Sequence, residues 1–449
     1  MLLRKLNFTA IFFTISMITT EELYQYYLEN PVISTDTRNI TTGCIFFALK
    51  GDHFNANEFA NQAIEKGAAY AVVNEARYAD HKQCILVDDC LSALQDLARH
   101  HRKQLNIPVI GLTGSNGKTT SKELVNAVLA EQYKTFATFG NLNNHIGVPL
   151  SILSITKDVE IAVIEMGANH QKEIELLCNI AQPTHGIITN VGMAHLDGFG
   201  GFEGVKKGKA ELYTYLKESG GYTFINRDNP YLLEMSGAAG LNKLIFYGTE
   251  NGNAIKGTLK NSDPFIEVDW TNHEVSSTVK TNLTGSYNFE NILAAICIGD
   301  FFDMNPEEIN KGLSNYQPKN NRSQLTKTEN NTIICDFYNA NPSSMTAALN
   351  NISALTADKK MAILGDMFEL GPESSAQHQL IAKQATESGL NEIILIGQHF
   401  YAFKHVFKAL FFETPLEAAD YLQKNPIKNN LVLLKGSRGM KLESLLEYL

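Results

Sequence analysis

The sequence predicts an α/β protein of three domains with largely parallel sheets. Short apolar runs alternate with helix-periodic stretches along almost the whole chain, the pattern of successive βαβ units. The length of 449 residues corresponds to three cores at about 150 residues each. A glycine-rich turn at residues 111–120 separates an apolar run from a helix-favouring segment, and this arrangement is typical of a phosphate-binding loop in a parallel sheet.

Composition excludes several classes of protein. The formal net charge is -10, the pI is about 5.7, and no Lys/Arg block occurs, which argues against nucleic-acid or anionic-membrane binding. The six cysteines are scattered and none forms a Cys-x-x-Cys pair. We therefore expect buried thiols in a reducing compartment, and neither a disulfide framework nor a zinc site.

The first expected domain covers residues 17–106. Strands are expected at 44–49, 69–73 and 84–87, followed by a connecting helix at 91–102. Upstream of it, Arg4 and Lys5 precede an apolar run at 6–18 that is broken by polar residues and is short for a membrane span. Residues 1–16 are compatible with a weak export signal, a disordered tail or a misassigned start. We favour Met17 as the start, because a capped helix follows it directly.

The second expected domain, residues 107–316, opens with the loop. The apolar run at 107–112 reads as a buried strand and 121–131 as a helix. Backbone N–H groups and the helix N-terminus would face an anion, Lys118 would contact the outer phosphates, and Thr119 would bind magnesium. The generic motif has glycine where Leu112 stands, with Gly111 one position earlier. The alternative is a strand-to-helix turn without a ligand.

The sequence predicts further helices and strands in this domain. Ser286 begins an expected helix at 286–298, and residues 254–283, with alternating polar and apolar positions, suggest a small β-meander. Strands are expected at 134–138, 161–165, 186–189, 222–225 and 244–247.

Four side chains of this domain are candidates for chemistry, each with a plain structural alternative. Glu165 ends a strand of the expected sheet and is placed to bind phosphate-bound magnesium, unless it is a solvated loop residue. His195 follows the next strand and is either a metal ligand or an ordinary loop histidine. Lys209 is one of three close lysines, and spacing alone gives it no role beyond a solvated face. Asn288 either reads an adenine edge or caps a helix.

A polar linker at 315–321 leads to the third expected domain, residues 317–449. Its strands are expected at 332–335, 361–364, 392–396 and 431–434, alternating with helices in a small dinucleotide-fold-like arrangement. Arg322 is an isolated cation. Polar segments at 336–342 and 435–439 follow strands and belong at one edge of the sheet, facing a cleft.

These segments together resemble the Mur ligase family. The matching motifs are Gly-x-Thr-Gly-Ser-Asn-Gly-Lys-Thr-Thr at 111–120, Asn-Leu-Asn-Asn-His-Ile-Gly-Val-Pro at 141–149, Glu-Met-Gly-Ala at 165–168 and Asn-Val-Gly-x-Ala-His-Leu at 190–196. Tyr-Asn-Ala-Asn-Pro at 338–342, Leu-Gly-Asp-Met-x-Glu-Leu-Gly at 364–371 and Lys-Gly-Ser-Arg-Gly-Met at 435–440 resemble the member that adds D-alanyl-D-alanine. The likeness covers nearly everything after Met17 and includes the offset glycine.

The resemblance implies an ADP-forming ligase of peptidoglycan precursor synthesis, hence a role in cell-wall formation, shape and division. It joins D-alanyl-D-alanine to a UDP-N-acetylmuramoyl tripeptide through an acyl phosphate. The implied cofactors are ATP, magnesium at two sites and a carbon-dioxide-derived carbamate on Lys209. The first domain would bind the uridine nucleotide, the second ATP and the third the amine. We expect a cytoplasmic monomer without membrane insertion.

The resemblance also assigns roles to individual residues. Implied catalytic residues are Lys118, Lys209, His195 and Glu165, and implied metal ligands are Thr119, Glu165, His195 and the modified Lys209. Implied ATP contacts are Gly114, Ser115, Asn116, Gly117, Lys118, Thr119, Thr120, Asn288, Asn291, Arg322 and Asp336. Implied substrate contacts are Thr35, Asp36, Arg38, Asn143, Asn144, Asn339 and Asn341, where Asp36-Thr37-Arg38 carries threonine in place of the family's serine.

Two alternatives remain open. Another ligase of the same family, such as a folylpolyglutamate synthetase or the ligase that adds the third peptide residue, would favour Asp-Tyr-Ala-His or a related sequence at 336–341. A P-loop NTPase switch would need neither a carbamate lysine nor an amine-binding domain.

Overall fold

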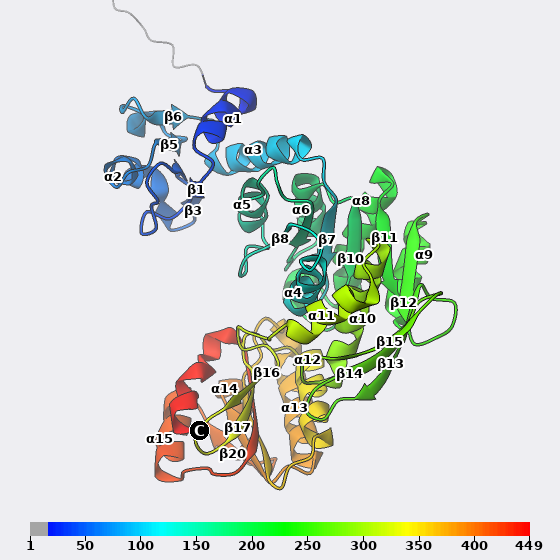
Figure 1. The fold of residues 1–449 in the computed structure, drawn as a ribbon. Coiled ribbons are helices and arrows are strands. Elements are labelled where there is room, and N and C mark those ends of the chain that lie inside the picture. The colour runs from blue at the N-terminus through cyan, green and yellow to red at the C-terminus, as the bar shows by residue number, and fades with distance from the viewer. Residues whose placement is uncertain (1–16) are drawn as a thin grey trace, which may run out of the picture. The chain divides into compact units, whose positions relative to one another are not determined.

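The computed structural model describes residues 17–449, so the predictions for residues 1–16 lie outside the described part. The chain forms two compact units. Residues 17–105 with Ile152–Thr156 form the first, and Asn106–Ser151 with Lys157–Leu449 form the second. Three main sheets organise them (Figure 1). Within residues 17–449, no helix combines the length and apolar character that crossing a bilayer requires.

The first unit is built on a four-stranded parallel sheet in the order β1-β2-β5-β6. Its strands are β1 (Ile33–Ser34), β2 (Ile45–Phe47), β5 (Tyr70–Val73) and β6 (Cys84–Leu86), and its helices are α1 (Thr20–Glu29), α2 (Ala60–Glu65) and α3 (Cys90–Gln104). The short strands β3 (Lys50–Gly51) and β4 (Phe54–Asn55) form an antiparallel pair, and η1 (Ala56–Phe59) and η2 (Ala76–Tyr78) are 3₁₀ turns.

Helix α1 begins as the sequence predicts, with a capping box between Thr19 and Glu22. The segment 152–156 belongs to this unit because its carbonyl groups accept hydrogen bonds there. Tyr27 Oη donates to the Leu153 carbonyl at 2.5 Å, and His101 Nε2 lies 2.9 Å from the Ile155 carbonyl.

The second unit contains a nine-stranded sheet in the order β15-β14-β13-β12-β11-β10-β7-β9-β8. Strands β8 (Thr135–Ala137), β9 (Ile161–Glu165), β7 (Val109–Thr113), β10 (His185–Ile188), β11 (Tyr222–Asn226), β12 (Leu244–Gly248) and β13 (Ile255–Asn261) are parallel, and β14 (Glu267–Thr271) and β15 (Ser276–Lys280) complete an antiparallel meander. The predicted meander at 254–283 is therefore confirmed.

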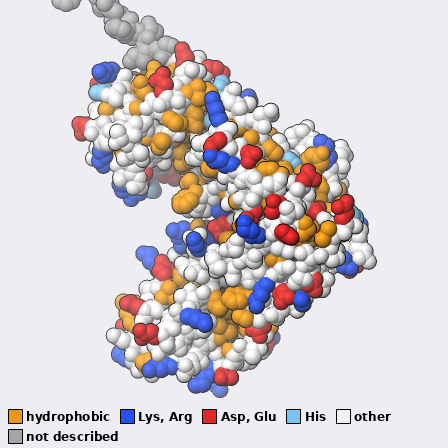
Figure 2. All heavy atoms as spheres, in the orientation of Figure 1, with side chains coloured by type: hydrophobic (Ala, Val, Ile, Leu, Met, Phe, Trp, Pro, Cys, Tyr) orange, Lys and Arg blue, Asp and Glu red, His pale blue; other side chains and the backbone are white. Residues whose placement is uncertain are grey.

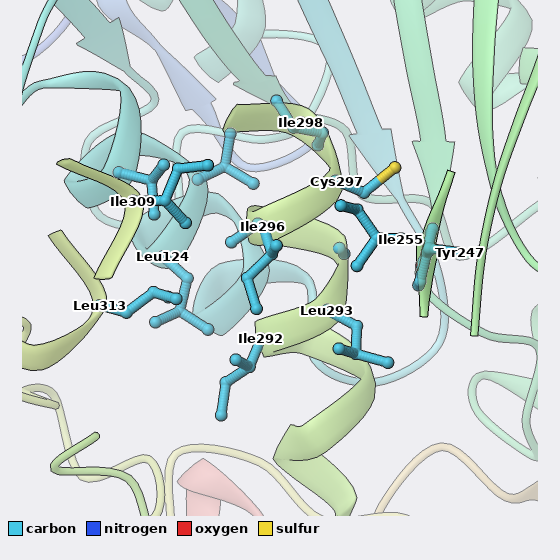
Figure 3. Packing of buried hydrophobic residues seen from close by; sticks show 14 of the residues in the cluster. Leu124, Tyr247, Ile255, Ile292, Leu293, Ile296, Cys297, Ile298, Ile309 and Leu313 are labelled. Atoms are coloured by element: carbon cyan, nitrogen blue, oxygen red, sulfur yellow. The ribbon is translucent and has the colours of Figure 1, made fainter. Parts of the chain in front are cut away.

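Helices cover both faces of this sheet. The helices in this part of the chain are α4 (Lys118–Leu129), α5 (Gly147–Leu153), α6 (Glu173–Ala181), α7 (Leu196–Phe199), α8 (Phe202–Ser219), α9 (Pro230–Ala239), the 3₁₀ turn η3 (Ser286–Asn288), α10 (Phe289–Phe301) and α11 (Pro306–Asn315). Figure 3 shows Ile292 and Ile296 of α10 packed near Leu124 of α4 and Leu313 of α11. This apolar layer holds α4, and with it the loop before α4, against the sheet.

A six-stranded sheet in the order β16-β17-β21-β18-β19-β20 forms the rest of the second unit. Its elements are β16 (Gln324–Lys327), β17 (Thr332–Asp336), α12 (Pro342–Ala354), β18 (Lys360–Gly365), η4 (Gly371–Glu373), α13 (Ser374–Glu387), β19 (Glu392–Ile396), α14 (Gln398–Tyr401), β20 (Leu410–Phe412), α15 (Pro415–Lys424), β21 (Leu431–Lys435), η5 (Arg438–Met440) and η6 (Leu442–Tyr448). Only β16 runs antiparallel to its neighbour. Apolar clusters line both faces, as the predicted dinucleotide-fold-like arrangement requires.

Two features of the surface and core agree with the composition. Acidic and basic side chains are interspersed on the face shown in Figure 2. Five of the six cysteines are buried, as predicted, and Cys84 is half-buried.

Candidate active site

The phosphate-binding loop lies between β7 and α4, and its geometry explains where glycine is needed. Gly114 has φ 148° and Gly117 has φ 74°. A Cβ on Gly114 would lie 2.0 Å from Thr189 Oγ1, and one on Gly117 would lie 2.7 Å from Asn291 Oδ1. Both positions therefore require glycine, for backbone conformation and for space.

At Gly111, the offset position, glycine is needed for a different reason. It lies inside β7, where a Cβ would come within 2.8 Å of Met166 Cε and 2.9 Å of Pro183 Cβ. Leu112, at the position where the generic motif has glycine, is fully buried in the core. Gly111 thus serves close packing between β7 and its neighbours, and the loop's own turn begins at Gly114.

Lys118 is the first residue of α4 and its amine folds back over the loop. Its Nζ donates to the carbonyls of Gly114 at 2.8 Å and Ser115 at 3.1 Å. Burial lowers the pKa of Lys118, and the charge of Arg322 lowers it further, whereas Glu165 opposes the shift. Backbone and lysine together present N–H groups to the same space.

Glu165, at the carboxyl end of β9, meets Thr119 and Asn143. Thr119 Oγ1 donates to Glu165 Oε2 at 2.9 Å, and Asn143 Nδ2 donates to Oε1 at 2.7 Å. The glutamate is only 1 % exposed, so it is not a solvated loop residue. Asn144 instead accepts from the amides of Ile146 and Gly147, which shapes the turn before α5.

The loop is tied to the segment that follows β10. Ser115 N donates to the Asn190 carbonyl at 3.0 Å, Thr189 Oγ1 donates to the Asn116 carbonyl at 2.6 Å, and Ser115 Oγ lies 2.9 Å from the Gly192 amide that donates to it. In register, Thr113 pairs with Ile188 of β10 and Leu112 pairs with Glu165 of β9, so all three loops emerge at one sheet edge.

His195 lies in the same segment with φ 53° and faces the six-stranded sheet. Its Nδ1 is 2.5 Å from Glu369 Oε2. The contact is an ion pair only when the imidazole is protonated. The contact with His195 lowers the pKa of Glu369, against an opposing effect of burial.

Lys209 lies inside α8 and is 2 % exposed, with Nζ 5.2 Å from the Phe199 ring centroid. Burial is the main cause that holds its pKa well below the ordinary value, and the charge of Lys118 acts in the same direction. Lys207 is exposed and Lys206 pairs with Glu203 and Glu234. The three lysines are therefore not one solvated face. The missed signal was that Lys209 falls on the buried helical stripe of Val205, Leu212 and Leu216.

Asn288 and Asn291 are buried at the start of α10. Asn291 Nδ2 donates to Asn288 Oδ1 at 2.9 Å, and Ser121 Oγ donates to Asn291 Oδ1 at 3.0 Å. Asn288 donates to the Thr284 carbonyl at 2.8 Å and makes no side-chain capping bond. The side chain of Asn288 therefore does not cap α10, and the capping alternative is wrong.

Arg322 and Asp336 belong to the part of the chain that leads into the six-stranded sheet. The Arg322 guanidinium carbon lies 3.7 Å from the Tyr338 ring centroid. Asp336 Oδ2 pairs with Lys435 Nζ at 2.7 Å, and both residues line the cleft.

Asn341 uses its whole side-chain amide within the protein. Its Oδ1 caps α12 by accepting from Ser344 N at 2.9 Å, and its Nδ2 donates to Asn116 Oδ1 at 2.7 Å. Asn339 Oδ1 accepts from the amide of the next residue, Ala340, at 2.9 Å. A substrate contact by either side chain stays a prediction.

These groups surround a cleft of about 670 Å³ within the second unit. We name the side formed by residues 114–120 with Glu165 the central wall, and the side formed by Arg322, Asp336, Asn341 and Lys435 the C-terminal wall. The sequence-predicted residues that line the cleft are Ser115, Asn116, Gly117, Lys118, Thr119, Thr120, Asn143, Asn144, Glu165, His195, Asn288, Asn291, Arg322, Asp336, Asn339 and Asn341. Tyr287 and Ser323, which sequence reasoning missed, also line the cleft. So do Tyr338 and Lys435, which belong to the two polar segments predicted to face a cleft.

Five predicted site residues do not line this cleft. Gly114 shapes the loop behind it and Lys209 is buried in α8. Thr35, Asp36 and Arg38 lie in the first unit, where the Arg38 guanidinium lies 2.8 Å from Asp36 Oδ2. Hydrogen bonds from the Arg38 side chain and backbone lower the pKa of Asp36 to about 2. The pair leaves Arg38 largely exposed.

Comparison with known proteins gives one consistent result. The Mur ligase middle domain matches residues 112–299, and the Mur ligase glutamate ligase domain matches residues 321–438. The UDP-N-acetylmuramoyl-tripeptide–D-alanyl-D-alanine ligase of Bacillus subtilis is 36% identical over 427 residues, 92% of each chain. The Escherichia coli ligase of the same name is 35% identical, with 82% of each chain covered.

Solved structures agree. MurF from Acinetobacter baumannii superposes with a TM-score of 0.86 at 31% identity, covering 96% of this chain and 98% of that chain. MurF from Thermotoga maritima in complex with ADP gives a TM-score of 0.83 at 26% identity, covering 94% and 97%. A folylpolyglutamate synthase from Mycobacterium tuberculosis, at 14% identity and a TM-score of 0.61 over 80% of this chain and 94% of that one, shares the fold alone.

Proposed function

Because the chain belongs to the Mur ligase family, we propose that it joins D-alanyl-D-alanine to a UDP-N-acetylmuramoyl tripeptide, with ATP as the energy source, in peptidoglycan precursor synthesis. The observation that carries the proposal is the 36% identity to a ligase of this name over 92% of both chains. The alternative of a folylpolyglutamate synthetase has only a fold-level likeness at 14% identity.

ATP binding is supported by the cleft and by the relative solved with ADP. The amides of residues 117–119 and the Lys118 side chain would hold the β- and γ-phosphates at the N-terminus of α4. Asn288 and Asn291, which line the cleft, would contact the adenine. Arg322 would add a positive charge from the C-terminal wall.

Magnesium fits the donors present. Thr119 Oγ1 and Glu165 Oε2 are already 2.9 Å apart, and both are the oxygen ligands that magnesium prefers. Residues 17–449 contain no cluster of three or more acidic, histidine or cysteine side chains able to hold a metal, which suits an ion whose other ligands are phosphate oxygens and water. Bound magnesium neutralises charge on the phosphates during transfer. We propose Thr119 and Glu165 for one site and His195 for a second.

A carbamate on Lys209 is supported by the depressed pKa of that amine. A neutral amine attacks carbon dioxide, forms an N–C bond, loses one proton and becomes an anion. This converts the buried amine, whose pKa the charge of Lys118 helps to depress, into an anion that is a counter-charge for Lys118. The carbamate would contribute to the second metal site.

The reaction would proceed in two displacements. The tripeptide carboxylate oxygen attacks the γ-phosphorus of ATP, and ADP leaves. The amine of D-alanyl-D-alanine then attacks the acyl carbon, loses a proton, and inorganic phosphate leaves from the tetrahedral intermediate. Lys118 and the loop amides orient the γ-phosphate, and the C-terminal wall excludes water from the acyl phosphate.

We propose that each expected domain binds one substrate: residues 17–106 the nucleotide-sugar, residues 107–316 ATP and residues 317–449 the amine. Thr35, Asp36 and Arg38 would bind the uridine nucleotide, and Asn143, Asn144, Asn339 and Asn341 would contact the peptide substrates. We further propose a cytoplasmic monomer, because the reaction consumes ATP and the chain has no coiled-coil pattern.

A phosphate-release assay tests this function. The protein is incubated with ATP, a panel of UDP-N-acetylmuramoyl tripeptides that differ at the third residue, and D-alanyl-D-alanine. We expect phosphate release only with both substrates, and formation of the pentapeptide product by mass spectrometry. ATP hydrolysis that is indifferent to both substrates would overturn the proposal in favour of a switch-type NTPase.

A further inference from the structure

Lys435 is a buried cation in the C-terminal wall that no step of the reaction above uses. It is the last residue of β21, pairs in register with Asp336 of β17 and is 2 % exposed. Its Nζ donates to Asp336 Oδ2 at 2.7 Å, to the Asn339 carbonyl at 3.3 Å and to the Asp336 carbonyl at 3.4 Å. An ammonium group has three donors, so this set of acceptors uses all of them.

The partner carboxylate connects this lysine to the nucleotide end of the cleft. Asp336 Oδ1 accepts from the Ser323 amide at 3.3 Å, and Ser323 Oγ lies 2.8 Å from Tyr287 Oη. Tyr287 precedes Asn288 in η3. A continuous polar chain therefore runs from the end of β21 to the start of α10.

The backbone of the intervening linker does not fix this arrangement by itself. Asn320, Asn321 and Ser323 all have positive φ values of 65°, 55° and 49°, a region that non-glycine residues adopt at a cost. Side-chain contacts must hold these residues in place. The Asp336–Ser323 bond is one of them, and Lys435 sets the orientation of Asp336.

The charge of Asp336 gives a second argument for a role of Lys435 in nucleotide binding. Asp336 lines a cleft built for a polyphosphate, and an isolated carboxylate there would repel the nucleotide. A buried ion pair contributes little to stability compared with apolar side chains of the same size, so the fold alone does not account for a lysine at this position. Pairing with Lys435 gives Asp336 a counter-charge at 2.7 Å without consuming Lys118 or Arg322.

We propose that Lys435 is a positioning residue for ligation: it orients Asp336 and the loop 336–339 so that the C-terminal wall accepts the nucleotide. The inference rests on the proposed function for its activity readout, but its binding readout does not. Lys435 acts through Asp336 and makes no contact with substrate.

The test is a double-variant cycle on ADP binding, measured by calorimetry with the full chain. Lys435→Met should weaken ADP about tenfold, and Lys435→Arg, which keeps the charge, should recover part of the loss. Because the lysine acts through Asp336, Lys435→Met/Asp336→Asn should bind ADP no more weakly than Asp336→Asn alone. Non-additivity of this kind identifies residues that act as one unit.

Lys360→Met is the matched control. Lys360 begins β18 in the same sheet and donates to the Ser353 and Leu355 carbonyls at 2.6 and 3.0 Å, but it does not line the cleft. We expect unchanged ADP affinity in this variant. In the ligation assay, Lys435→Met should raise the KM for ATP and leave the KM for the UDP-tripeptide within about twofold.

Two outcomes overturn the inference: ADP affinity of Lys435→Met within twofold of the unsubstituted protein, or a further loss when Lys435→Met is added to Asp336→Asn. Where Lys435→Met alone does not fold, the comparison of the double variant with Asp336→Asn decides, since the double variant leaves no unpaired buried carboxylate. Failure of the ligase proposal would show separately, as absence of ligation by the unsubstituted protein with ADP binding intact.

Discussion

The central wall of the cleft is fixed by its backbone, whereas the C-terminal wall is held by contacts between side chains. On the central wall, Gly114 and Gly117 have no room for a Cβ, and Glu165 continues a fully buried strand. On the C-terminal wall, Asp336 and Lys435 pair with each other. The central wall is thus preorganised by the sheet, while the C-terminal wall depends on contacts between side chains.

Polar contacts join the two sides of the cleft, between the walls and between segments next to them. Within the described residues they include Asn341 to Asn116 at 2.7 Å, the Met193 amide to Ser343 Oγ at 3.2 Å, and the His195–Glu369 pair at 2.5 Å. Polar contacts of this kind contribute little net free energy each. A substitution on the central wall should therefore cost far more activity than one at these contacts.

Lys209 should show the largest effect, because we propose that it carries the carbamate of the second metal site. Lys209→Ala should lower ligation by about 10³-fold or more, since it removes the group proposed to carry the second metal site. Excess bicarbonate should not restore activity. Lys207→Ala, at the exposed neighbour two residues away, is the control and should retain full activity. Ligation by Lys209→Ala at the unsubstituted rate would refute the carbamate assignment.

Gly114→Ala tests preorganisation of the same wall. A Cβ here would lie 2.0 Å from Thr189 Oγ1, so either the loop or the segment that follows β10 must shift. A shift of about 1 Å in a binding loop costs about 100-fold, and we expect ADP binding to weaken by that factor in calorimetry.

Gly140→Ala separates this clash from simple backbone strain. Gly140 also has positive φ, 57°, but nothing lies within 4 Å of its Cβ position. It should cost about 1 kcal/mol of unfolding free energy and leave ADP affinity unchanged. Equal ADP affinity for both variants would show that the loop is not preorganised by contact with Thr189.

The two walls also differ in how far the sequence predicts them. For the central wall, the loop motif, Glu165 at a strand end and the helix after the loop follow from local patterns, and the strand at 161–165 was predicted to the residue. Lys209 was found through family resemblance, because three neighbouring lysines hide the one that lies on the buried stripe of α8.

For the C-terminal wall, sequence patterns gave the strands but not their side-chain partners. Strands β16 and β20 were missed, since the first is a four-residue antiparallel edge strand and the second has only three residues. Lys435 and Asp336 are 99 positions apart in the chain and meet only because β17 and β21 are neighbours. Such pairing is set by topology, which no local pattern reports.

Asn341→Ala should give a moderate effect, since it removes a contact between the walls. The variant loses the α12 cap, worth about 1 kcal/mol of stability, and the hydrogen bond to Asn116, worth about 1 kcal/mol or fivefold in affinity. We expect the KM for D-alanyl-D-alanine to rise about fivefold in steady-state ligation.

Asn305→Ala is the matched control for that variant. Asn305 caps α11 with a capping box of the same kind but does not line the cleft. It should lower the melting temperature as much as Asn341→Ala and leave the KM unchanged. If both variants change the KM equally, the effect reflects loss of a helix cap, and the contact between the walls has no separate role.

His185 should show the smallest effect, and it tests whether the central wall is insulated from the far end of its own sheet. It begins β10, stacked on Tyr222 and Phe224. Burial, aided by the charge of Lys243, lowers its pKa to about 4. The unfolded chain, with a histidine pKa near 6.5, then binds more protons between pH 6.5 and 4, so this residue lowers stability as the pH falls through that window. From pH 7.5 to 5.5 the unfolding free energy should fall by about 1 kcal/mol because of this histidine.

The variant His185→Gln should show a smaller fall in unfolding free energy over this pH range, measured by denaturant melts. His273→Gln, at an exposed turn of the meander, is the control. ADP affinity at pH 7.5 should not change in either variant, because the loop is held by β7, β9 and the carboxyl end of β10. Weaker ADP binding by His185→Gln would mean that the central wall depends on the whole length of β10.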